Sequence, residues 1–129
     1  MAILAVYAGI LGLMFFFLSA RISLMRMNTR VLLGHADNPM LHRAIRAQAN
    51  FAEYVPLCLI LIGLIAALGF SAWVIHALCL VLIVVRLAHA LGVGYGVRGG
   101  QTVGAAMTYN IVIVASVLAI LGGGFAIRF

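Results

Sequence analysis

Four long stretches of this chain consist mostly of apolar side chains, at about residues 2–20, 40–68, 72–91 and 102–121. A helix needs about 20 such residues to cross a bilayer. A soluble domain of 129 residues, 67% of them hydrophobic, could not bury that much apolar surface. The sequence therefore predicts an all-α protein, an integral membrane four-helix bundle, with residues 1–129 forming a single domain.

The positive charges are placed unevenly along the chain. The net charge is +6, and every Lys or Arg position is an arginine. Seven of the eight arginines lie in or beside the polar segments at 21–46 and 86–98. Four spans put both segments on one face, which the positive-inside rule assigns to the cytoplasm. We therefore expect the N-terminus outside, arginine-rich loops in the cytoplasm, and no nucleic acid as a partner.

Turn-forming residues mark the predicted ends of the spans. The first span has no basic residues before it, so we expect it to be retained rather than cleaved as a signal peptide. Asp37 or Asn38 can cap a helix that starts at Pro39. The short turn Gly69–Ser71 makes the second and third spans antiparallel neighbours. We expect Gly92–Gly100 to form a loop, and the glycines at 122–124 to end the fourth span.

A polar stripe runs along the first half of the second span. Arg46, Asn50 and Glu53 fall within roughly 60° of one another at about 100° per residue. Such a face inside a membrane must contact protein or a water-filled pocket. Arg86 and His89 share a face of the third span at a similar depth, so we expect Glu53 to pair with Arg46 or Arg86. The alternative is that these residues only hold the helices together.

The arginines outnumber the acids, because Asp37 and Glu53 are the only carboxylate side chains. Surplus guanidinium groups suit an anionic ligand, either a carboxylate bound by two hydrogen bonds or a thiolate. No metal site is expected, since the histidines lack ligand spacing and Cys58 and Cys79 suit apolar packing. The G-x-G-x-x-G match at 94–99 lacks a preceding strand and is typical of a turn.

The string R-x-x-x-N-x-x-E-Y-x-P, which starts at Arg46 and ends at Pro56, resembles the second-helix signature of the MAPEG family. These are membrane-associated proteins of eicosanoid and glutathione metabolism. Arg86-x-x-His89 is similar to the family's third helix, so the resemblance covers essentially the whole chain. The chain most resembles the bacterial-type members of the family, and this resemblance implies a location in the bacterial inner membrane. It also implies a homotrimer that binds glutathione, as co-substrate, between subunits.

The resemblance also implies roles for individual residues. The family's thiol-activating arginine starts the fourth helix, where a gapless count reaches Thr102 here. Arg98 is the nearest arginine, so we expect Arg98 to activate the thiol and Arg86 to orient it, as the catalytic pair. Arg86 alone, or binding without fast catalysis, remains open. The expected glutathione contacts are Arg21, Arg46, Asn50, Glu53, Tyr54 and His89.

These observations lead to one functional hypothesis and two alternatives. We expect a glutathione-dependent membrane enzyme, a transferase or peroxidase, that acts on a lipophilic small molecule reached from the lipid bilayer. One alternative is a small four-helix transporter that uses Glu53 as a proton or cation site. The surplus arginines argue against it, because they would repel cations and keep Glu53 ionised. The other is a non-catalytic glutathione-binding membrane protein.

Overall fold

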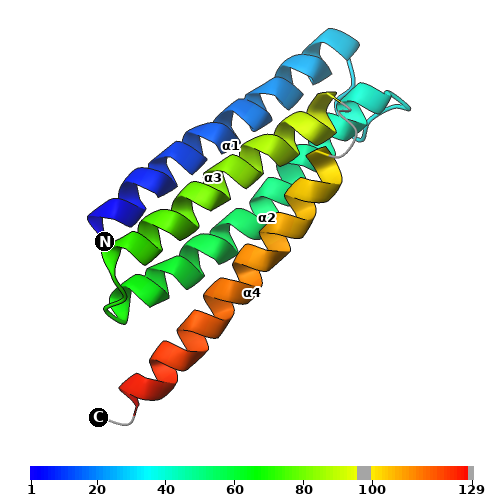
Figure 1. Cartoon of the computed structure of the whole chain (residues 1–129). Helices are drawn as coiled ribbons and strands as arrows, with labels where there is room; N and C mark the ends of the chain where they lie inside the picture. The colour runs from blue at the N-terminus through cyan, green and yellow to red at the C-terminus, as the bar shows by residue number, and fades with distance from the viewer. Residues whose placement is uncertain (96–99, 128–129) are drawn as a thin grey trace.

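The computed structural model describes residues 1–95 and 100–127, and this part of the chain is helical with no strand (Figure 1). Each helix is long and apolar enough to cross a membrane. The predicted all-α, multi-pass membrane bundle is therefore confirmed. The four helices are α1 (Ala2–Thr29), α2 (Pro39–Ala67), α3 (Ala72–Tyr95) and α4 (Gly100–Ala126).

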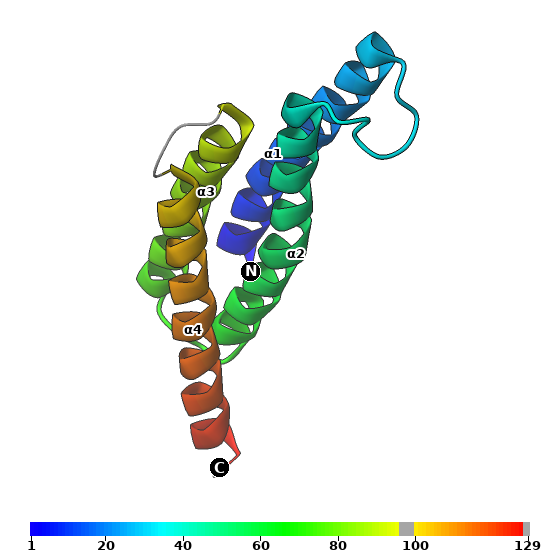
Figure 2. The same ribbon diagram turned by 90° about the vertical axis from the view of Figure 1, so that its right-hand side faces the viewer.

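The helices α2 and α3 form the centre of the bundle. The helix α1 packs against both of them, and so does α4, whereas α1 and α4 do not touch each other within the described residues. Figures 1 and 2 place the α1–α2 loop near the facing ends of α3 and α4, with both chain termini toward the other end. The segment at 21–46 and the described part of the segment at 86–98 therefore share one end of the bundle, while the membrane side on which they lie stays a prediction.

The first helix continues past its predicted end near residue 20 and reaches Thr29. Arg21 and Arg26 therefore lie on a helix and not in a loop. No glycine or proline interrupts this stretch, and arginine, methionine and leucine favour helix. The helix ends at Arg30, whose φ of 54° is left-handed. There the Arg26 guanidinium donates a 2.8 Å hydrogen bond to the Leu32 carbonyl.

The second helix begins where the sequence indicated. The Asn38 side chain accepts hydrogen bonds from the backbone N–H groups of Met40 and Leu41, at 3.0 and 3.1 Å. Pro39 follows as the first helical residue, where a missing N–H has no cost. Pro56 lies inside the helix, which continues past it and bends along its length (Figure 2). The predicted Asn38 cap and Pro39 start are confirmed.

The turn between α2 and α3 is as short as predicted, with Gly69 at a φ of 82°. Two other expectations about glycine were wrong. Residues 92–95 belong to α3, and α4 runs through Gly122 to Gly124. In an apolar surrounding, backbone groups stay paired within the helix, so glycine is a weaker terminator than in water. Gly122 serves packing instead, since a Cβ there would lie 2.6 Å from Cε2 of Phe70.

The core is a row of buried apolar side chains along the centre of the bundle. Cys58 and Cys79 belong to it as free, buried thiols, in line with the expected apolar packing. Exposed apolar side chains cover the outside of all four helices, as expected of a bundle that spans a membrane. The core includes Leu11, Phe51, Val55, Ile62, Ile65, Ile75, Leu82, Val85, Ile111 and Ala115. The exposed apolar side chains include Leu13, Phe16, Leu57, Ile60, Val84, Leu87, Ile113 and Ile120.

Two polar contacts join α1 to the rest of the bundle. Near its start, the Tyr7 hydroxyl lies 3.0 Å from Nδ1 of His76 on α3. Near its middle, the Gln48 side chain on α2 donates to the Ser19 hydroxyl at 3.5 Å. These contacts tie α1 to each of the two central helices.

Candidate functional site

Arg86 lies at the centre of a polar cluster on the arginine-bearing half of the bundle. Its side chain projects from α3 and is only 1% exposed. One terminal nitrogen of the guanidinium donates to the Asn50 side-chain carbonyl at 3.0 Å and to the Asn50 backbone carbonyl at 3.4 Å. The polar stripe of α2 therefore lies next to Arg86, as predicted, and Asn50 is the stripe residue that contacts it.

The other terminal nitrogen of Arg86 reaches α4. It donates a hydrogen bond to the Thr108 hydroxyl, which in turn donates to the Gly104 carbonyl at 2.7 Å. A single guanidinium thus connects α2, α3 and α4. Sequence reasoning did not select Thr108. The available signal was the polar run Thr108-Tyr109-Asn110 inside an otherwise apolar span.

Two tyrosines line the same cluster. The guanidinium carbon of Arg86 lies 5.9 Å from the centre of the Tyr54 ring, within the range of a cation–π contact. The Tyr54 ring lies 5.6 Å from the ring of Tyr109 on α4, tilted by 58°. Tyr54 was predicted as a ligand contact, whereas Tyr109 was not singled out.

The charge of Arg86 has no acidic partner among the described residues of the cluster. The expected ion pair with Glu53 is absent there, because Arg86 turns toward Asn50 and Glu53 is exposed. Nε of Arg86 is buried and has no hydrogen-bond partner in the part of the chain that the structure describes. A buried cation surrounded only by neutral groups is costly unless something compensates its charge. In a membrane helix, such a residue is a functional-site candidate by default.

His89 lies one turn beyond Arg86 and is also buried. The backbone of α4 passes very close to it. A Cβ at Gly104 would lie 2.6 Å from Cβ and 2.8 Å from Cα of His89. The absence of a side chain at Gly104 therefore allows α3 and α4 to pack closely at this position.

The side chains of the predicted polar stripe on α2 point in two directions, some into the bundle and some out of it. Asn50 and Tyr54 are half-buried and contact Arg86, whereas Arg46 and Glu53 are exposed on the isolated chain. Arg21 is half-buried on α1. Arg98, the predicted thiol-activating residue, lies outside the described residues. The described part of the site is thus the buried guanidinium of Arg86 with neutral partners, beside an exposed face of α2 that carries Arg46 and Glu53.

A second polar group lies in the α1–α2 loop. The rings of His35 and His42 are 4.6 Å apart, and they border a cavity of about 310 Å³ together with Asp37, Pro39 and Arg43. In the part of the chain that the structure describes, no three His, Cys, Asp or Glu side chains are grouped as metal ligands would be.

The sequence was compared with known families and proteins. The MAPEG family matches residues 4–121. The chain is 32% identical over 88 residues to Inner membrane protein YecN of Escherichia coli strain K12. The aligned region covers 68% of this chain and 67% of that protein. The chain has the same identity and coverage with Inner membrane protein YecN of Escherichia coli O6:H1.

Proposed function

This chain belongs to the MAPEG family, membrane proteins that include glutathione-dependent enzymes, and from that premise we propose that it is itself such an enzyme. The proposed reaction is transfer of glutathione to a lipophilic electrophile, or reduction of a lipophilic peroxide by glutathione. The observation that carries the proposal is the buried, acid-free guanidinium of Arg86 behind an exposed polar face on α2.

The chemistry of this face suits glutathione, which carries two carboxylates, one ammonium group and a thiol. The exposed guanidinium of Arg46 matches a carboxylate, and the exposed carboxylate of Glu53 matches the ammonium group. Asn50 has both donor and acceptor groups for the peptide units, although its side-chain carbonyl is already held by Arg86. We propose that Arg21, Tyr54 and His89 complete the binding site.

The exposure of Arg46 and Glu53 supports a site shared between subunits. A charged side chain that faces lipid at the centre of a helix costs at least about 2.5–3.5 kcal/mol. A neighbouring copy that covers this face of α2 would remove that cost and complete a pocket. We therefore propose a homotrimer with glutathione between subunits, as the family resemblance implies.

The burial of Arg86 supports a division of roles between two arginines. Arg86 is enclosed by α2, α3 and α4, so it positions Asn50 and adds positive potential without touching the thiol. A thiol needs nearby positive charge to ionise at neutral pH. We propose that Arg98, which precedes α4, supplies this charge by direct contact with the sulfur.

The absorbance of thiolate in the glutathione-bound, detergent-purified protein tests this proposal. We expect a thiolate signal near neutral pH that is lost in Arg98→Ala. In Arg86→Ala the signal should persist while affinity for glutathione falls. Conjugation of a generic aryl halide then reports turnover. Loss of thiolate only in Arg86→Ala would reverse the two roles, and its absence from the unmodified protein would leave a non-catalytic glutathione-binding protein.

We propose the bacterial inner membrane as the location, since the curated relatives are named inner membrane proteins. The arginine-bearing end of the bundle would face the cytoplasm. A transporter that uses Glu53 is the competing function. Proton or cation uptake by reconstituted vesicles that is abolished in Glu53→Gln, with no glutathione bound, would favour it.

A further inference from the structure

The side chain of Tyr109 on α4 lies beside the proposed glutathione site. Its ring contacts the ring of Tyr54 on α2, with 5.6 Å between the ring centroids. The preceding residue, Thr108, turns inward to Arg86, whereas Tyr109 keeps 49% of its surface exposed. A tyrosine hydroxyl inside an apolar span usually has a hydrogen-bond partner. Tyr54 and Tyr109, which we call the tyrosine pair, thus place two phenols at the edge of the Arg86 cluster.

The positive charge of Arg86 lies directly behind this pair. Its guanidinium carbon is 5.9 Å from the centre of the Tyr54 ring. The described hydrogen-bond partners of the guanidinium, Asn50 and Thr108, are neutral and leave its charge uncancelled. In surroundings of low dielectric constant, such a charge acts over longer distances than in water. The tyrosine pair therefore suits an anion, because it offers two O–H donors with a positive charge behind them.

Distance along α2 separates the two ends of bound glutathione. Arg46 and Glu53 are seven residues apart, about 10 Å at about 1.5 Å per residue. Three residues of extended chain, at about 3.3–3.6 Å each, have nearly the same length. With its ammonium group at Glu53 and one carboxylate at Arg46, glutathione has its γ-glutamyl end deep in the bundle. The γ-glutamyl carboxylate shares a carbon atom with the ammonium group, so it lies beside Glu53 and needs a partner there.

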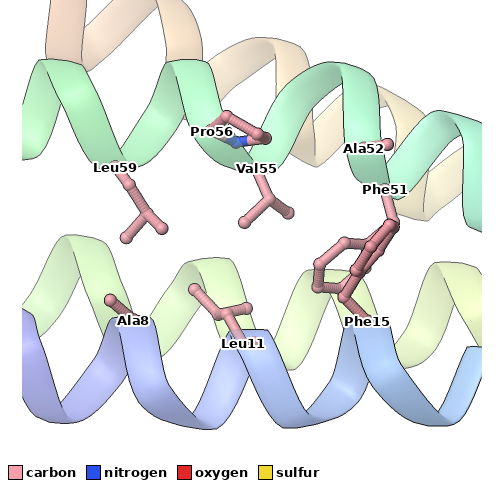
Figure 3. A pocket seen from close by; sticks show the side chains of 9 residues that line it. Ala8, Leu11, Phe15, Phe51, Ala52, Val55, Pro56 and Leu59 are labelled. Carbon is pink, nitrogen blue, oxygen red and sulfur yellow. The ribbon is translucent and has the colours of Figure 1, made fainter.

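The α1 side of α2 offers apolar contacts at this depth. Figure 3 shows Phe15 of α1 next to Phe51 of α2, and the residues that line the space between the two helices are all apolar. Arg21 lies six residues beyond Phe15, about 9 Å nearer the α1–α2 loop. Because α1 and α2 are antiparallel, Arg21 lies near the level of Arg46. The deep carboxylate is therefore left to the α4 side, where Tyr109 is the described polar neighbour of α2.

We propose that Tyr109, together with Tyr54, binds the γ-glutamyl carboxylate of glutathione. This inference rests on the proposed function, and it fixes the direction in which glutathione lies. Each tyrosine hydroxyl donates to one oxygen of the carboxylate. Arg86 does not touch the ligand and favours the anion from behind the pair. The site thereby selects glutathione over thiols that lack this carboxylate.

Glutathione analogues combined with single variants test the proposal in the full, detergent-purified protein. Tyr109→Phe removes one hydroxyl and keeps the ring. The analogue 4-aminobutanoyl-cysteinyl-glycine lacks the γ-glutamyl carboxylate, whereas glutathione monoethyl ester has its glycine carboxylate blocked. We expect Tyr109→Phe to weaken binding of glutathione and of the ester roughly tenfold or more, as for a lost hydrogen bond to a charged group. Binding of the 4-aminobutanoyl analogue should not change. Titration calorimetry measures each affinity.

Two control variants accompany Tyr109→Phe. Arg46→Ala should give the opposite pattern, with weaker binding of glutathione and the 4-aminobutanoyl analogue and unchanged binding of the ester. Tyr7→Phe removes a hydroxyl at the other end of the bundle, where it contacts His76, and should bind all three ligands like the unmodified protein. Circular dichroism and gel filtration would confirm that the variants are folded.

Three outcomes would overturn the proposal. An equal loss for all three ligands in Tyr109→Phe would show that the hydroxyl shapes the pocket without recognising the carboxylate. Unchanged glutathione affinity in Tyr109→Phe would assign the carboxylate to another group, and the same titrations with Arg21→Ala would show whether Arg21 is that group. Both results would leave the proposed function intact. An unmodified protein that binds no glutathione would overturn the proposed function as well.

Discussion

Arg86 on α3 and Asn50 on α2 are joined side chain to side chain at 3.0 Å, although Glu53 lies only three residues further along α2. A neutral amide therefore receives the buried guanidinium, and the carboxylate remains on the outside. The positive charge of Arg86 is left uncompensated inside the described bundle, which is the basis for assigning an anionic ligand to this region.

The hydroxyl of Thr108 is expected to stabilise the three-helix junction. Thr108→Val keeps the shape of the side chain but removes the acceptor for Arg86. A buried charged donor that loses one partner should lower the free energy of unfolding by about 1–3 kcal/mol. Unfolding in mixed detergent micelles measures the change. Thr108→Ser, which keeps a hydroxyl, is the control, and equal stability of the two variants would contradict the prediction.

The contact between Gly104 and His89 is expected to tolerate no side chain. Gly104→Ala would place a Cβ 2.6 Å from the His89 Cβ, so α3 and α4 must separate. We expect a loss of about 1–3 kcal/mol in the free energy of unfolding, typical of overpacking. Gly123→Ala, on the same helix but beside open space, should not lower stability, because alanine favours helix over glycine. A loss of similar size in both variants would show that the close approach to His89 is not the cause.

The carboxylate of Glu53 is expected to bind the ammonium group of glutathione. Glu53→Gln keeps the shape and removes the charge, so binding should weaken by about 1.5–3 kcal/mol, the range for a charge-assisted hydrogen bond. Titration calorimetry measures the affinity. Asp37→Asn neutralises the other acid, in the α1–α2 loop, and should have no effect. Full affinity in Glu53→Gln would leave this carboxylate a role in helix contacts alone.

Both arginine-bearing connections are expected on the cytoplasmic side. A topology reporter fused at residue 35 and another fused after residue 97 should each report the cytoplasm, because the α1–α2 loop lies at the same end of the bundle as the facing ends of α3 and α4. A reporter at residue 70, in the α2–α3 turn, is the control and should report the side of the membrane away from the cytoplasm. Fusions at 35 and 97 that report different sides would refute the arrangement of spans.

Local signals in the sequence were enough to place most of the fold. Apolar runs located the four spans, and Asn38, Pro39 and Gly69 marked two of the connections correctly. The errors came from residues that act differently in water and in lipid. Arginine at 21 and glycine at 122 suggested helix ends, yet the backbone stays helical at both positions. Whether glycine ends a helix or admits a neighbour depends on what packs there, and spacing along the chain does not show that.

The sequence predicted most of the residues of the candidate site, but it did not predict which of them contact each other. Periodicity grouped Asn50 with Arg46 and Glu53, and depth matched this group to Arg86. The rotation of α2 about its axis then decides which edge of the stripe meets α3, and that rotation depends on packing along the whole helix. Thr108 was missed for a related reason, since the polar run at 108–110 does not show which of its side chains turns toward Arg86.

The two polar contacts of α1 have a consequence for its freedom of movement. Tyr7 and Ser19 are twelve residues apart, about 120° around the helix at 100° per residue, and they bind different neighbours, α3 and α2. A helix that slid along or turned about its axis would break at least one of these bonds. Uncharged side chains thereby set the register of α1 against both α2 and α3.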